Sequence, residues 1–278
     1  MISKIGLRLV MSMLTVALIS FAGGAHSEGA KTGINVQTIT TYPPFEFKDL
    51  KSNELTGFDI DLLNALAVKM GVEAKWTESS FDQLISFSAL KTKRADVAAS
   101  AMGDTPERRA SVSFVDYLYD VQVFYTLHSN AYRFPTADAL CGRPVAVARA
   151  SVIHHDAVIR WSEENCLKAG KPGVVVISSD VGQALQMLNQ GRVDAAVYGE
   201  ASVAYRNKLD GNRYITLGKP LAKLMLGIAF RKDDHELGEA LKKALDALIA
   251  EGTYATLLRK WGMTDGASIQ RAMINGQP

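Results

Sequence analysis

The stretch Ser100-Ala101-Met102-Gly103-Asp104-Thr105-Pro106-Glu107-Arg108 combines the end of a predicted strand, a glycine-containing turn and the start of a helix. Pro106 suits the first helical position, where its missing N–H would have no partner. Free amides at a helix start attract anions. Arg108 lies in the first turn, where its charge opposes the helix dipole unless an anion binds beside it. From this spacing alone, an anion site and a surface arginine paired with Glu107 or Asp104 are equally compatible with the sequence.

On both sides of this stretch, short β-forming runs alternate with helical runs, which predicts an α/β fold. We expect strands at 34–40, 96–99, 145–148, 174–177, 193–198 and 227–230. Helices are expected from 56–59 to Met70, over 180–191 and 233–250, and around 254–261. Thr56 with Asp59 and Ser80 with Gln83 have the spacing of capping boxes. Because helices separate several successive strands, those strands cannot form tight hairpins.

The composition excludes several classes of protein. A hydrophobic share of 47% with 22% charged residues is typical of globular chains and excludes a disordered or fibrous one. The 278 residues suffice for one large domain or for two lobes of about 100–150 residues each. The 31 Lys and Arg residues against 29 Asp and Glu residues give a net charge of +2, too weak to indicate a nucleic-acid partner.

Residues 1–27 have the layout of a cleavable signal peptide. Lys4 and Arg8 form a basic start, an apolar run follows from Leu9 to Phe21, and Ala25-His26-Ser27 offers a cleavage site. An N-terminal anchor helix is the alternative, but a membrane-spanning helix needs about 20 apolar residues and this run is shorter. We therefore expect a soluble mature protein in the periplasm.

Export makes Cys141 and Cys166 informative, because they are the only two cysteines and an oxidising compartment favours a disulfide between them. The alternative is a pair of buried free thiols. Two cysteines without paired histidine spacing make a poor zinc site. The adjacent His154 and His155 would point about 100° apart on a helix and cannot both face one site. We expect no metal and no cofactor.

The chain contains the motifs Gly57-Phe58-Asp59-Ile60-Asp61-Leu62 and Thr105-Pro106-Glu107-Arg108. With these motifs it resembles the family 3 extracellular solute-binding proteins, the amino-acid receptors of ABC importers. The similarity continues through 42–47, 80–82, 191–196 and 252–254. It implies a two-lobed α/β fold of the type II periplasmic-binding-protein class, with two crossing hinge strands and a ligand cleft between the lobes. Lobe 1 would comprise residues 31–120 plus 226–278, and lobe 2 residues 121–225, which contain both cysteines.

The resemblance also assigns ligand-binding roles. Arg108 would bind the carboxylate of the ligand, because its guanidinium stays protonated and matches a carboxylate with two hydrogen bonds. Ser100, Ala101 and Gly103 would supply further donors. Tyr42 and Phe81 would hold the ligand side chain between two aromatic rings. Ser151 and Val152 would form a second helix start that faces an anion, and Tyr198 would lie near the ligand side chain. For Tyr42 and Phe81, ordinary core packing is the alternative.

The chain departs from the family pattern at Gly199, where the family usually places an aspartate that accepts the ligand ammonium. A second frequent carboxylate position is occupied by Ile39. A buried ammonium without an anion is costly. Either the adjacent Glu200 or another acid replaces the aspartate, or the ligand is not a standard α-amino acid.

These features predict a receptor, not an enzyme: a monomer that closes about its hinge on a small carboxylate-bearing solute, an amino acid or a similar compound. It would deliver this solute to an ABC permease in the inner membrane. The alternative is an enzyme of the cyclohexadienyl-dehydratase type on the same fold, for which Glu200 is the one candidate acid. A sensor ectodomain would need a transmembrane segment from a partner.

Overall fold

The computed structural model describes residues 32–148, 152–179, 181–263 and 265–277. The expected signal peptide at 1–27 and the role expected for Ser151 lie outside the described residues. Within the described part of the chain, no helix is both long and apolar enough to cross a membrane.

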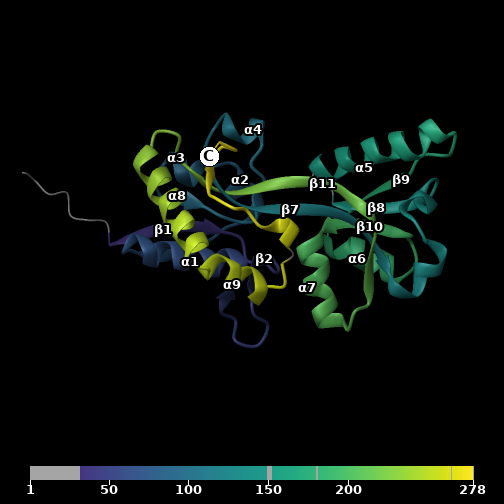
Figure 1. Ribbon diagram of the computed structural model, residues 1–278, viewed down its shortest axis with the longest axis horizontal. Helices are drawn as coiled ribbons and strands as arrows, with labels where there is room; N and C mark the ends of the chain where they lie inside the picture. The colour runs from purple at the N-terminus through teal and green to yellow at the C-terminus, as the bar shows by residue number, and fades with distance from the viewer. Residues whose placement is uncertain (1–31, 149–151, 180, 264, 278) are drawn as a thin grey trace, which may run out of the picture. The chain divides into compact units, whose positions relative to one another are not determined.

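A nine-stranded mixed sheet organises the fold, in the order β5-β1-β6-β11-β7-β10-β8-β9, with β12 paired to β7 (Figure 1). Its strands are β1 (Gly33–Thr38), β5 (Glu73–Glu78), β6 (Val97–Ala98), β7 (Ser113–Leu127), β8 (Pro144–Ala148), β9 (Val175–Ser179), β10 (Ala195–Gly199), β11 (Tyr214–Phe230) and β12 (Met273–Ile274). A small sheet contains β2 (Thr41–Tyr42), β3 (Glu46–Lys48) and β4 (Leu55–Thr56). The α/β class expected from the sequence is confirmed.

The long strands β7 and β11 form the antiparallel centre of this sheet. Their register runs from Ser113 opposite Phe230 to Leu127 opposite Tyr214, with irregularities at 217–222 and 226–227. Of the residues in these two long strands, the sequence pattern predicted a strand only over 227–230. Nearly all residues of β7 are buried, so the alternation of apolar and polar residues that marks a half-exposed strand is missing.

Helices cover the sheet on both sides of this central pair. Figure 1 shows α1 (Phe58–Met70), α8 (His235–Ala250) and α9 (Thr253–Lys260) beside β1. It shows α5 (Val152–Asn165), α6 (Val181–Asn189) and α7 (Glu200–Asp210) beside β8 and β10. Shorter elements are α2 (Phe81–Ile85), α3 (Ser88–Lys91), α4 (Pro106–Arg109), and the 3-10 turns His128–Arg133, Ala137–Leu140, Leu167–Ala169 and Asp265–Ala267.

Two expected helix boundaries are confirmed, and one capping prediction is wrong. The capping box of Ser80 and Gln83 starts α2, and the left-handed Gly71 ends α1. However, Gly57 caps α1 without any side-chain bond, so Thr56 and Asp59 form no capping box. A β-carbon on Gly57 would lie 2.0 Å from the carbonyl oxygen of Phe45, so only glycine allows the chain to pass there. The side chain of Asp59 makes other contacts, which are described below.

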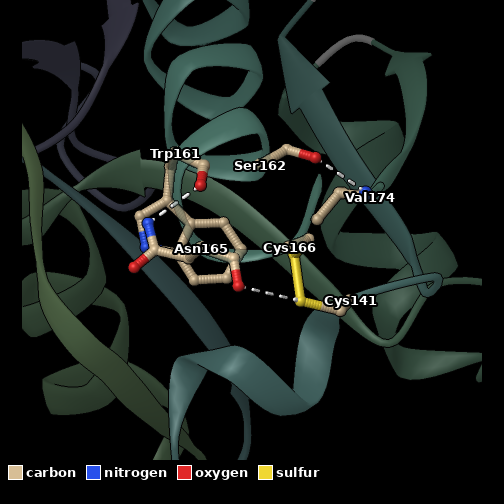
Figure 2. Close-up of a disulfide and its surroundings, with 6 residues drawn as sticks. All are labelled: Cys141, Trp161, Ser162, Asn165, Cys166 and Val174. Carbon is tan, nitrogen blue, oxygen red and sulfur yellow. Dashed lines mark hydrogen bonds between the residues drawn. A yellow bond between two sulfur atoms is a disulfide. The ribbon is translucent and has the colours of Figure 1, made fainter. Parts of the chain in front are cut away.

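Cys141 and Cys166 form the expected disulfide, with an S–S distance of 2.06 Å (Figure 2). It links the chain just before β8 to the end of α5. Nearby, the hydroxyl of Ser162 in α5 accepts a hydrogen bond of 2.9 Å from the amide of Val174, which precedes β9. The disulfide and this bond hold α5 against the sheet edge formed by β8 and β9.

Candidate functional site

One cavity of about 950 Å3 collects most of the residues that the sequence singled out. This volume is in the range of small-molecule sites. Seven predicted residues line it: Tyr42, Phe81, Ser100, Ala101, Gly103, Arg108 and Tyr198. Gly199 and Glu200 are not among its lining residues. Gly199 ends β10 and Glu200 begins α7. Val152 is the first residue of α5.

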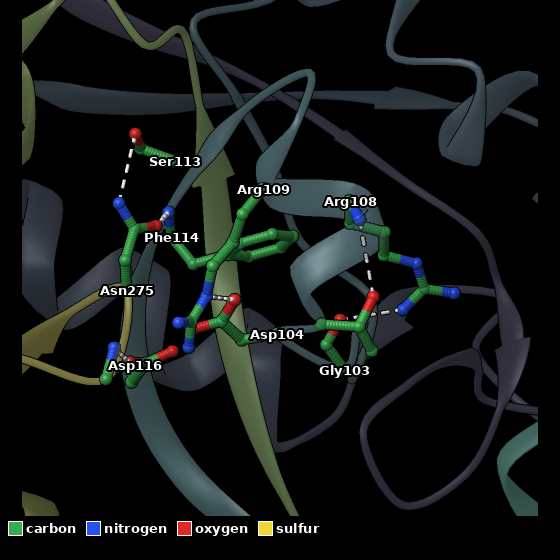
Figure 3. Close-up of polar contacts among 10 residues, drawn as sticks. Gly103, Asp104, Arg108, Arg109, Ser113, Phe114, Asp116 and Asn275 are labelled. Carbon is green, nitrogen blue, oxygen red and sulfur yellow. Dashed lines mark hydrogen bonds and ion pairs between the residues drawn. The ribbon is translucent and has the colours of Figure 1, made fainter.

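Arg108 extends from α4 toward the turn that precedes it (Figure 3). Its Nη1 donates a hydrogen bond of 2.8 Å to the carbonyl oxygen of Gly103. Burial lowers the pKa of its guanidinium, an effect that the nearby charge of Glu107 opposes. Among the described residues, no carboxylate forms an ion pair with Arg108. The guanidinium therefore has donors available on the cavity side.

The neighbouring Arg109 is engaged elsewhere. Figure 3 shows the side chains of Arg108 and Arg109 leaving α4 in different directions. Arg109 donates two hydrogen bonds, of 2.5 and 2.6 Å, to the carboxylate of Asp104. Because both carboxylate oxygens of Asp104 bind Arg109, Asp104 is not the ion-pair partner of Arg108. The alternative in which Arg108 is a surface arginine paired with Asp104 is therefore wrong.

Asp120 in β7 is a cavity residue that the sequence analysis missed. Its Oδ2 accepts a hydrogen bond from the side-chain amide of Gln122, and its buried Oδ1 has no hydrogen-bond partner among the described residues. Burial raises the pKa of the Asp120 carboxyl to about 6, and the charge of Glu200 adds to this shift. The signal available in the sequence was an acid between Tyr119 and Val121 in a largely apolar stretch, where a charge needs a reason.

The absence of a side chain at residue 199 makes room for Asp120. The strands β7 and β10 are neighbours, with Gly199 opposite Gln122 in the register. A β-carbon on Gly199 would lie 2.5 Å from Asp120 Oδ1. The Asp120 carboxylate thus occupies the space that a side chain at position 199 would need.

Aromatic rings form another part of the cavity wall. The ring centres of Tyr42 and Tyr198 are 5.8 Å apart, and Tyr42 also stacks on Phe45 at 5.3 Å. Phe81, the first residue of α2, contributes a further ring to the lining. Such faces suit an apolar or cationic ligand side chain. The described part of the chain contains no group of three or more His, Cys, Asp or Glu residues placed to hold a metal ion.

Comparison with known proteins identifies similar chains. The family model of the bacterial extracellular solute-binding proteins, family 3, matches residues 34–264. The histidine-binding periplasmic protein of Escherichia coli (strain K12) is 31% identical over 262 residues, covering 91% of this chain and 96% of that protein. The L-arginine-binding protein of Pseudomonas aeruginosa is 32% identical over 261 residues, covering 91% and 95%.

The fold comparison agrees with the sequence comparison. The structure of an ancestral arginine-binding protein bound to arginine aligns with a TM-score of 0.66 and 32% identity, covering 83% of this chain and 98% of that one. The similarity therefore extends through the sheet, the helices and the segments that line the cavity.

Proposed function

Since the chain belongs to family 3 of the bacterial extracellular solute-binding proteins, we propose that it is the periplasmic receptor of an ABC importer for an amino acid or a similar carboxylate-bearing solute. The proposal includes removal of residues 1–27, a monomeric mature protein and delivery of the solute to an inner-membrane permease. It also includes two lobes, residues 31–120 plus 226–278 and residues 121–225, that close on the ligand.

The observation that carries the proposal is the position of Arg108 in the cavity without an ion-pair partner among the described residues. A half-buried guanidinium is stabilised by an anion, and a ligand carboxylate can accept two of its hydrogen bonds. Ser100, Ala101 and Gly103 lie in the same wall and limit where that carboxylate can sit.

Asp120 supports the amino-acid part of the proposal. It lines the same cavity, and its carboxylate has a buried oxygen without a hydrogen-bond partner in the described structure. A ligand ammonium would stabilise the ionised form of Asp120, as the guanidinium would stabilise the ligand carboxylate. Glu200 is the competing acceptor expected from the sequence. Its charge acts on Asp120, so the two acids form one electrostatic unit.

The experiment that tests the function begins by unfolding and refolding the protein to remove any bound solute. A thermal-shift screen of the standard amino acids, followed by calorimetry, should then identify a saturable ligand. Ligand at 100 times Kd should add about 2.7 kcal/mol to the free energy of unfolding. Prephenate and arogenate belong in the same screen, and their conversion to aromatic product would favour the enzyme instead.

A further inference from the structure

Two buried carboxyl groups lie behind the cavity wall, outside the set of residues that line it. Glu46 comes from β3 and is 0% exposed, and Asp59 comes from the first turn of α1 and is 2% exposed. Neither has a basic partner, since the hydrogen bonds they accept within the described structure come from neutral groups. Buried acids without a counter-charge are rare and need an explanation.

The sequence brings these two acids together through one close approach. At Gly57 the chain passes against the carbonyl of Phe45, and the amides of Phe58 and Asp59 donate to the carbonyls of Pro44 and Phe45 at 2.8 and 2.9 Å. These bonds fix the start of α1 on the corner that precedes β3. The Asp59 carboxyl is thereby held close enough for its charge to act on Glu46.

Both acids hold the ligand-facing turn that follows β6. The hydroxyl of Ser100 donates a hydrogen bond of 2.6 Å to Glu46 Oε1. The amide of Ala101 donates to Asp59 Oδ2 at 2.8 Å, while Ala101 has a left-handed φ of 40°, which is unfavourable for a residue with a β-carbon. Tyr117 in β7 donates from its hydroxyl to both oxygens of Asp59, at 2.8 and 2.9 Å. Ser100 and Ala101 both line the cavity.

Electrostatics opposes ionisation of both acids at the same time. Burial raises the pKa of Glu46 well above its ordinary value, and the charge of Asp59 raises it further, although the Ser100 bond opposes this. Burial also raises the pKa of Asp59, to about 6, because the Ala101 amide and the Tyr117 hydroxyl compensate only in part. Two other titratable groups interact with the charge of Glu46: Tyr42 from β2, and Tyr117, whose hydroxyl bonds to Asp59. The pair therefore keeps a proton to higher pH than two separate carboxyl groups would, and Glu46 is the acid whose pKa the charge of its neighbour raises.

We propose that Glu46 and Asp59 are positioning residues for ligand recognition, a pair that shares one proton and locks the Ser100–Ala101 turn in its left-handed shape. Because the Ser100 hydroxyl donates its proton to Glu46 in this arrangement, only its lone pairs face the cavity. Ser100 therefore accepts a hydrogen bond from an N–H or O–H group of the solute and does not donate to its carboxylate. This assignment rests on the proposed solute binding.

The test uses Glu46→Gln and Glu46→Leu in the refolded full-length mature protein, with the exposed Glu73→Gln as the matched control. Gln keeps a neutral group that accepts from Ser100, so affinity should stay within about threefold of the parent. Leu removes that acceptor and should weaken binding by about tenfold or more in a variant that still melts cooperatively. A merely structural role would change the melting temperature in the Leu variant and leave its affinity unchanged.

A pH series separates positioning from ordinary packing. In the parent protein and in Glu73→Gln, affinity should decline at alkaline pH as Glu46 and the solute amine lose their protons, and in Glu46→Gln the decline should be smaller because only the amine contributes. The amide resonance of Ala101, recorded without ligand, should shift near pH 6 in both proteins as Asp59 titrates, and should shift again at higher pH in the parent but not in Glu46→Gln. If the shift at higher pH is the same in both proteins, the proposed pairing of Glu46 with Asp59 is overturned, whether or not any solute binds. Parent-like affinity in the Leu variant, or an alkaline decline as large in the Gln variant as in the parent, would also overturn it. Absence of any ligand for the parent would count against the proposed function instead.

Discussion

Asp120 Oδ1 in β7 occupies the place where a side chain of residue 199 in β10 would begin, since a β-carbon on Gly199 would lie only 2.5 Å away. A β-carbon essentially never approaches a non-bonded oxygen so closely, so residue 199 must be glycine while Asp120 keeps this conformation. The sequence showed that position 199 lacks the carboxylate that is usual in the family, but it did not show that Asp120 lies beside this position. The geometry places a carboxylate at nearly the same point in space, supplied from the adjacent strand.

If Asp120 accepts the ligand amine, Asp120→Asn should weaken binding of a cationic amine by about 2–5 kcal/mol, because a buried charge loses its partner. A matched solute without the amine should bind almost unchanged, and calorimetry with both solutes measures the difference. Glu200→Gln is the control, because Glu200 is the competing acceptor. A selective loss in Glu200→Gln with none in Asp120→Asn would assign the role to Glu200.

The close approach of Asp120 to Gly199 also predicts a compensating pair of substitutions. Gly199→Asp alone should lower the melting temperature and abolish binding, since two carboxylates would compete for one place. The double variant Asp120→Ala with Gly199→Asp should recover amine binding, because it moves the carboxylate to the other strand. Equal loss in the single and double variants would show that the two positions are not exchangeable.

Binding of an amine should weaken at acid pH. The pKa of Asp120 is raised to about 6 in the unliganded protein, so its carboxyl loses its negative charge as the pH falls below that value. Affinity should then decline by up to about tenfold per pH unit below 6. Asp120→Asn should remove this decline of affinity at acid pH. A decline that persists in that variant would come from another group.

Asp116 predicts a different effect of pH, on stability. Burial and the charge of Asp104 raise its pKa to about 8, while its Oδ2 accepts a bond of 2.7 Å from the amide of Gly276 (Figure 3). The folded state thus keeps a proton that the unfolded state releases, and the free energy of unfolding falls as pH rises from the ordinary aspartate value toward 8. Asp116→Asn keeps an acceptor for Gly276 and should be more stable than the parent at neutral pH. Denaturant titrations at several pH values measure this, and an unchanged pH slope would contradict it.

Local features of the fold could be predicted from the sequence, because their causes lie within a few residues. The stop of α1 at Gly71 and the capping box of Ser80 are of this kind. The turn before Arg108 was also recognised, since strand end, glycine and proline are adjacent in the chain.

The parts that escaped prediction depend on contacts between distant residues. Glu46 and Ser100 are 54 positions apart and Asp59 and Ala101 are 42 apart, so nothing local reveals that these acids support the cavity wall. Asp59 was expected to form a capping box with Thr56, which is what its position at the start of α1 suggests. The close fit of Asp120 against Gly199 depends on β7 pairing with β10, and the extent of β7 was itself hidden by its burial on both faces.

The central claim, that a solute carboxylate binds Arg108, is tested most directly by calorimetry of Arg108→Gln and Arg109→Gln beside the refolded parent protein. Both variants remove one guanidinium from α4, but only Arg108 lines the cavity, while Arg109 is paired with Asp104. We expect Arg108→Gln to lose about 2–5 kcal/mol of binding free energy for the best solute of the screen. Arg109→Gln should bind that solute like the parent, at some cost in thermal stability. Parent-like affinity in Arg108→Gln would contradict the account.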